Sequence, residues 1–450
     1  MKENSLISTP ILDFVQQYAE ENTVRLHMPG HKGKSFLGFE AWDITEIGGA
    51  DSLYEAEGII AESEANATNL FGSKKTLYST EGSSQCIRAM LYLALLQKKQ
   101  GMRPVVAAAR NVHKAFIYAA TLLDFDVIWL WPEQKEESIC SCHISKEQVE
   151  KVLEEHEEVL AVYLTSPDYL GGQQDIRGIA KVCHDRGVLL TVDNAHGAYL
   201  KFLEPSQHPL DLGADLCCDS AHKTLPVLTG GAYLHIGKNA PDIFTEQAKY
   251  ALNLFGSTSP SYLTLSSLDM CNQYLAGEYV EKLKEMNVIR NQYANELSAA
   301  GWQIVKSDPL KITIAIPNDS SSSDLAQKLR EKGIECEYVD QNYIVFMLTP
   351  ENTKQDLERL LLVLGKNKDE YKEKEYVSIS HTKQMMSIRE AMLSLPETVS
   401  IAEATNRICR VPTVSCPPAI PIAVPGELIT QELITMFQYY GITSLDVVKE

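Results

Sequence analysis

The sequence predicts an α/β protein whose largest part is a mostly parallel sheet covered by helices. Three observations lead to this prediction. Short apolar runs alternate with helical patterns through 76–236. Some of these runs, such as Val-Leu-Leu-Thr-Val at 188–192, are apolar on both faces, as buried parallel strands are. The chain also has 450 residues, which is too long for one ordinary core and suits two or three domains.

The expected strands of the large sheet are short runs rich in valine, leucine and alanine. They lie at 105–109, 127–131, 159–165, 188–192, 216–219 and 232–236. Helical patterns at 146–156 and 176–186 separate several of them. Near the N-terminus, an amphipathic stretch is indicated by Ile11, Phe14, Val15 and Tyr18.

The second half of the chain contains a smaller α/β part. A long helical region, 262–299, precedes a βαβ-like unit with a strand at 311–316, a helix at 323–332 and a strand at 335–345. A charged segment, 365–375, is the best linker candidate, and a third unit follows at 376–450. Its Pro-rich run, 416–427, cannot be helical, because proline removes backbone donors and clashes with the preceding turn.

Composition excludes several classes of protein. The formal net charge of −19 argues against a general nucleic-acid binder, whereas it is compatible with a cationic substrate or with an ordinary acidic cytosolic protein. The start of the chain lacks a signal-peptide pattern, and no stretch approaches the roughly 20 apolar residues of a membrane span. The ten cysteines show no zinc-binding spacing. We therefore expect a cytoplasmic protein with no metal and no membrane contact.

Four clusters of polar residues fall just after expected strands or at a helix start, where open parallel sheets bind ligands. The first is Ser220-Ala-His222-Lys223, after the strand at 216–219. The amino group of a lysine at this point is placed to form an imine with an aldehyde cofactor. The alternative is that Lys223 is an ordinary solvated lysine.

The second cluster, Asp193-Asn-Ala-His196-Gly197, follows the strand at 188–192. An aspartate at the end of a buried strand can pair with a protonated pyridine nitrogen and keep the ring cationic. The alternative is that Asp193 caps the loop between a strand and a helix. A candidate imine-forming lysine after the next strand favours the first interpretation.

The remaining clusters suit a phosphate and an aromatic ring. Glu81-Gly-Ser83-Ser84 opens an expected helix, and backbone N–H groups, hydroxyls and the helix dipole there favour a phosphate. A plain serine N-cap is the alternative. Asn111-Val-His113-Lys114 follows the strand at 105–109, where an imidazole can stack on a pyridine ring or serve only the structure. Together the four clusters supply what a phosphorylated pyridine aldehyde needs.

The order of these clusters resembles the fold-type I enzymes that use pyridoxal 5'-phosphate (PLP). Within them, the chain is similar to the bacterial ornithine/lysine/arginine decarboxylase family. Further similarities are His27-Met-Pro-Gly-His-Lys32, Asp43-Ile-Thr-Glu46, Gly49-Ala-Asp51-Ser-Leu53 and the Pro-Pro-Ala-Ile-Pro-x-x-x-Pro-Gly-Glu427 run. The resemblance covers nearly the whole chain, and its motifs are specific in combination.

The resemblance implies roles for individual residues. Lys223 is the lysine that forms the imine with PLP, Asp193 pairs with the ring nitrogen, and His113 stacks on the ring. The residues implied at the phosphate or elsewhere around the cofactor are Ser83, Ser84, His196, Ser220 and His222. In the segment 256–260, Thr258 is implied to reach the phosphate from the second subunit. Lys223 and His222 are the candidates for returning a proton to the substrate Cα after CO2 leaves.

The resemblance also implies a fold like that of aspartate aminotransferase. It divides the chain into an N-terminal segment 1–55, a large PLP-binding domain 56–260, a helical connection with a small α/β domain 261–370, and a C-terminal α+β decarboxylase domain 371–450. The large inducible members of the family begin with a flavodoxin-like domain, which this chain lacks, so we do not expect their decamers by default. Those members also tend to carry Trp where this chain has His196, which leaves the substrate contacts open.

The expected reaction is decarboxylation of a basic amino acid to its amine for polyamine synthesis. Arginine is favoured over lysine or ornithine, because the short form resembles biosynthetic arginine decarboxylases. As a hypothesis, Asp43, Glu46, Asp51 or Glu427 pairs with the distal cation of the substrate, although helix caps and surface charges are the alternative. A homodimer or larger homo-oligomer with a shared active site is expected. The other open interpretations are an aminotransferase or aldolase, and a non-catalytic PLP-binding protein.

Overall fold

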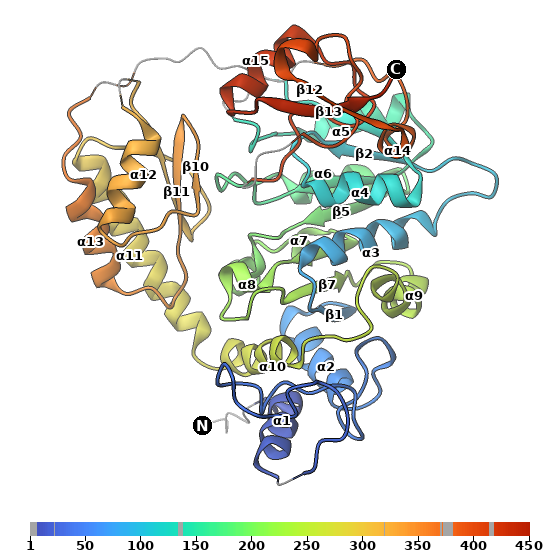
Figure 1. The fold of residues 1–450 in the computed structure, drawn as a ribbon, viewed down its shortest axis with the longest axis vertical. Coiled ribbons are helices and arrows are strands. Elements are labelled where there is room, and N and C mark those ends of the chain that lie inside the picture. The colour runs from blue at the N-terminus through green and yellow to red at the C-terminus, as the bar shows by residue number, and fades with distance from the viewer. Residues whose placement is uncertain are drawn as a thin grey trace. The chain divides into compact units, whose positions relative to one another are not determined.

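The computed structural model describes residues 7–21, 23–133, 138–318, 320–369, 371, 381–413 and 418–450. It divides into two compact units, each built from two stretches of the chain (Figure 1). The first unit comprises Met1–Gln97 and Leu189–Lys284, and the second comprises Lys98–Val188 and Glu285–Glu450. No helix among the described ranges is both long enough and apolar enough to cross a membrane.

Strands β1 to β7 make a mostly parallel sheet. They are β1 (Lys75–Ser79), β2 (Val105–Ala109), β3 (Asp126–Leu130), β4 (Val159–Thr165), β5 (Leu189–Asp193), β6 (Leu216–Asp219) and β7 (Ala232–Ile236). In the first unit the order is β1-β7-β6-β5, with β5 parallel to β6 and with β7 antiparallel to both β6 and β1. In the second unit β2 lies between β4 and β3 and is parallel to both.

Six of these strands confirm the predicted runs to within one residue at each end. The sequence did not predict β1, because Lys-Thr-Leu-Tyr-Ser contains only two apolar residues in an otherwise polar run. Its residues 76–79 are nevertheless buried, since β1 packs beside β7 on the sheet and under α2 and α3. The helices predicted at 146–156 and 176–186 are confirmed as α5 (Lys146–Glu155) and α6 (Ile176–Asp185).

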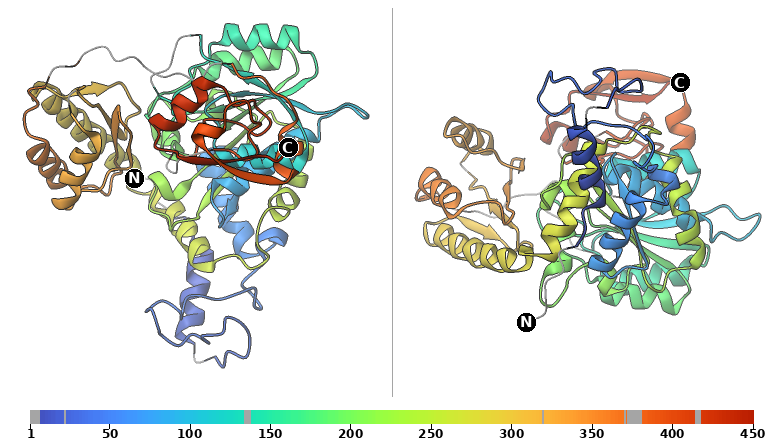
Figure 2. Two further views of the ribbon diagram at one scale, coloured as in Figure 1. Left: turned by 45° about the horizontal axis from the view of Figure 1, so that its top comes forward. Right: turned by 90° about the horizontal axis from the view of Figure 1, so that it is seen from below.

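The helices of the first unit surround its strands. They are α1 (Pro10–Glu20), η1 (Leu53–Glu55), α2 (Ile59–Phe71), α3 (Ser83–Leu95), η2 (Ala198–Phe202), α7 (Pro209–Leu212), α8 (Ala221–Thr224), α9 (Asp242–Asn253) and α10 (Tyr262–Ala276). The amphipathic stretch predicted near the N-terminus is α1, whose Ile11 and Val15 are buried. α1, α2 and α10 pack together (Figure 2). Asp269 of α10 fixes the start of α1 by accepting the N–H groups of Ile11 at 2.8 Å and Leu12 at 3.0 Å.

The second unit contains the other described elements. They are α4 (Lys114–Leu123), α5, α6, most of α11 (Tyr279–Ala299), β8 (Gln303–Val305), β9 (Lys311–Ala315), α12 (Ser322–Glu331), β10 (Tyr338–Val339), β11 (Tyr343–Met347), α13 (Lys354–Leu364), α14 (Ile388–Leu393), β12 (Pro396–Ser400), η3 (Ile401–Glu403), α15 (Gln431–Tyr439) and β13 (Ser444–Val448). The predicted helical region 262–299 is two helices, α10 and α11, which are separated at Gly277.

The prediction of a βαβ-like unit in the small domain was wrong. The small sheet has the order β10-β11-β9-β8, and every pair in it is antiparallel. The single strand predicted at 335–345 is interrupted at Asp340, whose carboxylate accepts the N–H groups of Asn342 at 2.8 Å and Tyr343 at 2.7 Å. This tight turn sends β11 back along β10 and next to β9, so no parallel crossover forms.

The C-terminal part of the second unit is built around an antiparallel pair, β12 and β13. Its core shares a buried cluster with Tyr338, Tyr343 and Val345 of the small sheet. The described part of the Pro-rich run, 418–427, contains no helix, as predicted, whereas residues 416 and 417 lie outside the described ranges. Most of the predicted linker beyond residue 369 also lies outside them, so the predicted domain boundaries stay predictions.

Candidate active site

In the first unit, three loops with polar residues come to the same edge of the sheet. β5 and β6 are parallel and end at Asp193 and Asp219. β1 is antiparallel to β7, which is antiparallel to β6, so β1 runs in the direction of β6 and ends at that edge too. Ser83 begins the helix that follows β1, Asp193 is the last residue of β5, and Lys223 lies in the short helix that follows β6. Ligands bind at such carboxyl ends in open sheets of this class.

The amino group of Lys223 faces an imidazole. Lys223 lies in the one-turn helix α8, directly after β6, and its Nζ is 3.1 Å from Nε2 of His196. His196 is 4% exposed, whereas Lys223 is only half-buried. Nδ1 of the neighbouring His222 donates to the carbonyl of Gly231 at 2.9 Å. Lys223 is therefore partly buried against an imidazole, while its bond to a cofactor stays a prediction.

Asp193 provides a buried carboxylate at the end of β5. It is 2% exposed, and its Oδ1 accepts the N–H of Ala195 at 3.2 Å and lies 3.7 Å from the thiol of Cys218. The following 3-10 helix, η2, has Gly197 as its N-cap, so Asp193 is not the cap of that helix. The bond from Ala195 is a local cap of this loop, so the alternative stands beside the prediction that Asp193 pairs with a ring nitrogen.

The loop before α3 brings hydroxyl groups to this edge. Ser220 donates from its Oγ to Oγ of Ser83 at 2.8 Å, which joins the loop after β6 to the first turn of α3. The N-cap of α3 is Gly82, with φ of +71°, so the alternative of a serine N-cap is wrong. Gly82 donates its N–H to the carbonyl of Gly230 at 2.7 Å. Side-chain hydroxyls and the positive end of a 13-residue helix therefore meet here.

The segment with Thr258 lies beside this loop in the same chain. Ser257 donates its N–H to Oε1 of Glu81 at 2.9 Å, and Thr258 is exposed. At Gly256 a Cβ would lie 2.0 Å from the hydroxyl of Tyr54 and 2.1 Å from Nε2 of Gln85, so only glycine allows this approach. The role of Thr258 toward a second subunit stays a prediction.

The residues present in the first unit fit PLP. The cofactor has an aldehyde, a ring nitrogen and a phosphate, which require an amine, a buried carboxylate and a set of hydroxyl and N–H donors. Lys223, Asp193 and the pair Ser83 and Ser220 provide these groups on three neighbouring loops at one edge of the sheet. Ser84 is the second residue of α3 and lies in the same first turn.

Three carboxylates that were predicted for the substrate lie in the N-terminal segment. Asp43 is ion-paired with His31 at 3.1 Å, and Glu46 is exposed and accepts the hydroxyl of Thr45 at 2.7 Å. Asp51 accepts the N–H groups of Gly58 at 2.9 Å and of Ile60 at 3.0 Å, at the start of α2. Burial raises the pKa of Asp51, but these backbone hydrogen bonds outweigh it and leave the pKa below its ordinary value. Asp51 therefore caps the start of α2, which was the alternative to a contact with the substrate.

His113 and Glu427 belong to the second unit. His113 is the N-cap of α4, and its Nδ1 accepts the N–H of Ala115 at 3.1 Å. The next residue, Lys114, donates its N–H to the carbonyl of Ala419 at 2.9 Å. The loop that holds His113 is therefore fastened to the C-terminal part of the chain, while stacking of His113 on a ring stays a prediction.

Glu427 is buried and already has a cationic partner. Its Oε2 lies 3.3 Å from Nη2 of Arg110, and the two side chains are 1% and 4% exposed. The same oxygen accepts the N–H of Val424 at 2.7 Å. Arg110 also donates to the carbonyls of Pro421 at 2.9 Å and Ile422 at 3.0 Å. These contacts satisfy Glu427 within its own unit, so its predicted contact with a substrate has no support in this geometry.

Sequence reasoning did not predict several polar residues behind this edge of the sheet. They are Asn194, His208, Asp219 and His235, and all four are completely buried. Asp219 had one signal in the sequence, because it ends a strand and directly precedes Ser220. His208 and His235 gave no signal, since each is a single histidine with no partner near it in the sequence.

Known proteins resemble this chain in sequence and fold. Sequence models of the Orn/Lys/Arg decarboxylase major domain and C-terminal domain match residues 9–313 and 371–445. An arginine decarboxylase of Bacillus subtilis (strain 168) is 28% identical over 460 residues, covering 95% of this chain and 92% of that protein. One of Halalkalibacterium halodurans is 28% identical and covers 94% and 91%. The crystal structure of a Francisella novicida lysine decarboxylase aligns with a TM-score of 0.81 at 17% identity, covering 99% of this chain and 82% of that one.

Proposed function

We propose that arginine is the substrate of this chain, which belongs to the Orn/Lys/Arg decarboxylase family and is a PLP-dependent decarboxylase of basic amino acids. The observation that carries the choice of arginine is the end-to-end similarity to arginine decarboxylases, which spans both family domains. The products are CO2 and the amine of the substrate, which is a precursor for polyamines.

The residues at the edge of the first unit's sheet suit this reaction. PLP, when bound, supplies an electron sink that stabilises the carbanion left at Cα as CO2 departs. The buried carboxylate of Asp193 holds a proton on the ring nitrogen, because a buried negative charge favours a cation beside it. The amino group of Lys223, which faces His196, returns a proton to Cα. His222 is the second candidate for this proton transfer, through its Nε2.

The distal cation of the substrate needs a carboxylate that is not already satisfied. Asp51 accepts several backbone N–H groups, and Glu427 is paired with Arg110. Asp43 and Glu46 are more exposed, and Glu46 has only a neighbouring hydroxyl as a described hydrogen-bond partner. We therefore assign the guanidinium contact to Glu46 first and to Asp43 second.

The assembly we propose is a homodimer, in which Thr258 reaches the phosphate of the second subunit. Support comes from the exposed position of Thr258 beside the Glu81 loop. We also place the protein in the cytoplasm. The nine described cysteines are all free, which suits a reducing compartment.

The test is CO2 release from arginine, lysine and ornithine, measured in parallel on the PLP-loaded protein without any 2-oxo acid. We expect release from arginine with the highest kcat/KM, and we expect Glu46→Gln to raise the KM for arginine more than that for a shorter apolar amino acid. Release that is fastest from lysine or ornithine would replace the substrate. Turnover that requires a 2-oxo acid would instead establish an aminotransferase.

A further inference from the structure

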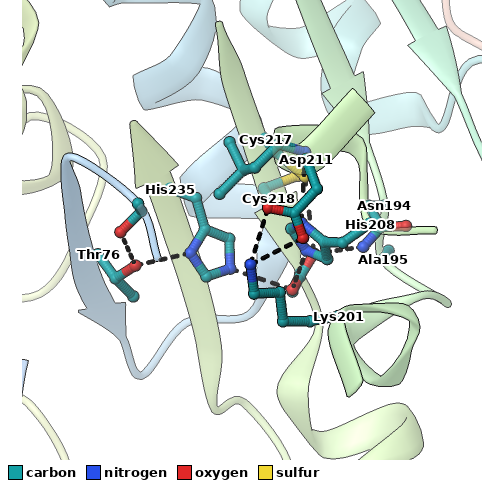
Figure 3. Close-up of polar contacts among 12 residues, drawn as sticks. Thr76, Asn194, Ala195, Lys201, His208, Asp211, Cys217, Cys218 and His235 are labelled. Atoms are coloured by element: carbon teal, nitrogen blue, oxygen red, sulfur yellow. Dashed lines mark hydrogen bonds and ion pairs between the residues drawn. The ribbon is translucent and has the colours of Figure 1, made fainter. Parts of the chain in front are cut away.

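The ends of β5 and β6 are joined by a buried network around the carboxylate of Asp219. Its Oδ2 accepts from Nε2 of His208 at 3.0 Å and from Nε2 of His235 at 3.0 Å. Its Oδ1 accepts from Nδ2 of Asn194 at 2.7 Å. Figure 3 shows the two imidazoles and Asn194 converging from different segments of the first unit. The carboxylate, both imidazoles and the amide are each 0% exposed, so protein groups replace water around this charge.

The outer nitrogens of the two imidazoles fix their protonation. Nδ1 of His235 lies 2.8 Å from the hydroxyl of Thr76 (Figure 3). Nδ1 of His208 accepts the N–H of Leu210 at 3.4 Å. A ring that accepts at Nδ1 carries its proton on Nε2, which donates to Asp219. Burial lowers the pKa of His235 in the same direction. Burial raises the pKa of Asp219, but the facing His208 and His235 outweigh it and hold the pKa below its ordinary value. Asp219 is therefore an ionised carboxylate within the network.

This network connects the two loops that carry the reactive groups. Asn194 directly follows Asp193, and Asp219 directly precedes the Ser220-Ala-His-Lys223 segment. The side-chain bond from Asn194 to Asp219 therefore spans from one loop to the other, next to the backbone bond from the N–H of Asn194 to the carbonyl of Cys218 at 2.9 Å.

We propose that Asp219 is a positioning residue, which holds Asp193 and Lys223 at the separation that PLP requires. It accepts hydrogen bonds from the buried side chains of Asn194, His208 and His235, so both strand ends are fixed before the cofactor arrives. The inference rests on the cofactor part of the proposed function and does not depend on arginine as the substrate.

The same groups are of kinds that bind transition metals. Within the described part of the chain, ligand atoms of His208, Cys217 and Asp219 lie within 4.8 Å of one another. Two observations favour a hydrogen-bonded network over a metal site. Nε2 of His208 carries the proton that it donates to Asp219, so it presents no lone pair. Burial also raises the pKa of the Cys217 thiol well above its ordinary value, which disfavours the thiolate that a metal needs.

Asp215 on the same connection provides a matched control. It precedes β6, is 5% exposed, and accepts the N–H of Leu190 on β5 at 2.8 Å. Asp215 thus joins β5 to β6 at their first residues, whereas Asp219 joins them at their last residues. Asp215→Asn and Asp219→Asn remove the same charge from the same pair of strands, at opposite ends.

The experiment compares both variants with the wild-type protein in three measurements. These are the thermal midpoint of the PLP-free protein, the affinity for PLP by equilibrium titration, and the pH at which the visible absorbance of bound PLP changes. We expect both variants to lose thermal stability. Only Asp219→Asn should weaken PLP binding, by about 10-fold or more. This is the size of loss found when residues that orient metal ligands are removed. The same variant should also shift the absorbance titration. Asp215→Asn should keep the PLP affinity within about twofold.

Equal PLP affinity and an unchanged absorbance titration in Asp219→Asn would overturn the inference. Losses of affinity in both variants in proportion to their thermal midpoints would also overturn it, because the role would then be structural. Wild-type protein that does not bind PLP would instead contradict the proposed function, so the two failures are distinguishable.

A second variant keeps the test decisive if Asp219→Asn does not fold. Asn194→Ala removes the side-chain bond to Asp219, keeps the backbone bond to Cys218 and leaves both histidines on Asp219. We expect it to weaken PLP binding less than Asp219→Asn but more than Asp215→Asn, and unchanged affinity would contradict the inference. Stoichiometric zinc binding by the PLP-free wild type that is lost in Cys217→Ser would likewise overturn it in favour of a metal site.

Discussion

The two units of this chain each bury a carboxylate beside a loop that carries a predicted site residue, but they satisfy it differently. In the first unit, the carboxylate of Asp219 accepts hydrogen bonds from two imidazoles and an amide and has no arginine or lysine among these partners. In the second unit, Glu427 is neutralised by Arg110, whose Cζ lies 5.3 Å from the ring centroid of Trp129 and 5.6 Å from that of Trp131.

The two buried carboxylates have different structural roles. The ion pair in the second unit joins two segments that are 317 residues apart, and its charges cancel, so it fastens the C-terminal part to the end of β2. The network in the first unit joins two adjacent strand ends and leaves a charge next to the chemistry. The role of a carboxylate therefore cannot be predicted from the sequence until its partner in the fold is known.

The largest effect is expected from removing the reactive amine in the first unit. Lys223→Ala should lower kcat by at least about 1000-fold, because it removes both the site of cofactor attachment and a proton donor. It should also abolish the visible absorbance of covalently bound PLP. Lys181→Ala, which removes an exposed lysine paired with Asp185 on α6, is the control and should change neither. Retention of CO2 release by Lys223→Ala would refute the assignment.

The next effect tests the ion pair in the second unit. Arg110→Met should destabilise that unit by about 3–5 kcal/mol, because it leaves the Glu427 carboxylate buried without a cation. Adding Glu427→Gln should restore much of this loss, since the double variant has no unpaired charge. Denaturant unfolding monitored by tryptophan fluorescence measures both, since Trp129 and Trp131 contact Arg110. If Glu427→Gln alone raises the KM for arginine at unchanged stability, the carboxylate acts on substrate and the comparison fails.

A smaller effect concerns how the free energy of unfolding depends on pH through the buried His235 of the first unit. Burial lowers the pKa of His235 from 6.5, so below that pH the unfolded chain binds a proton that the folded protein does not. This contribution to stability is fully present above pH 6.5 and is lost as pH falls, by at most about 1.4 kcal/mol per pH unit. His235→Gln should flatten this part of the profile of unfolding free energy between pH 7.5 and 5.5. An identical slope in the variant would show that His235 is not neutral in the fold.

The smallest effects separate a helix cap from a substrate contact. Asp51→Ala should cost about 1 kcal/mol of stability, because α2 loses its N-terminal hydrogen bonds, and it should leave the KM for arginine unchanged. Glu46→Gln should raise the KM for arginine and leave the stability unchanged, since Glu46 is exposed and its described hydrogen-bond partner is a neighbouring hydroxyl. Steady-state kinetics and thermal midpoints of the two variants decide between the assignments, and an unchanged KM in Glu46→Gln would remove Glu46 as the contact.

Much of the large sheet could be predicted because its strands are local and apolar. The runs that became β2, β4, β6 and β7 are identical to the predicted ones. β1 was not predicted, because its own residues are mostly polar and it is buried only by packing against α2, α3 and β7. The turn at Asp340 was missed for a related reason, since three side-chain hydrogen bonds to backbone and hydroxyl groups decide that the chain turns there.

The sequence by itself determined the motifs at the strand ends, their order, and hence the family and the cofactor. Those features are short and contiguous, so local composition and spacing contain them. Only the tertiary structure decided which carboxylates are free to act. Asp51 meets the N–H groups of α2, Glu427 meets Arg110, and Asp219 meets two histidines that arrive from separate segments. The physical reason is that the state of a charge depends on the groups around it in space, and folding brings those groups from distant parts of the chain.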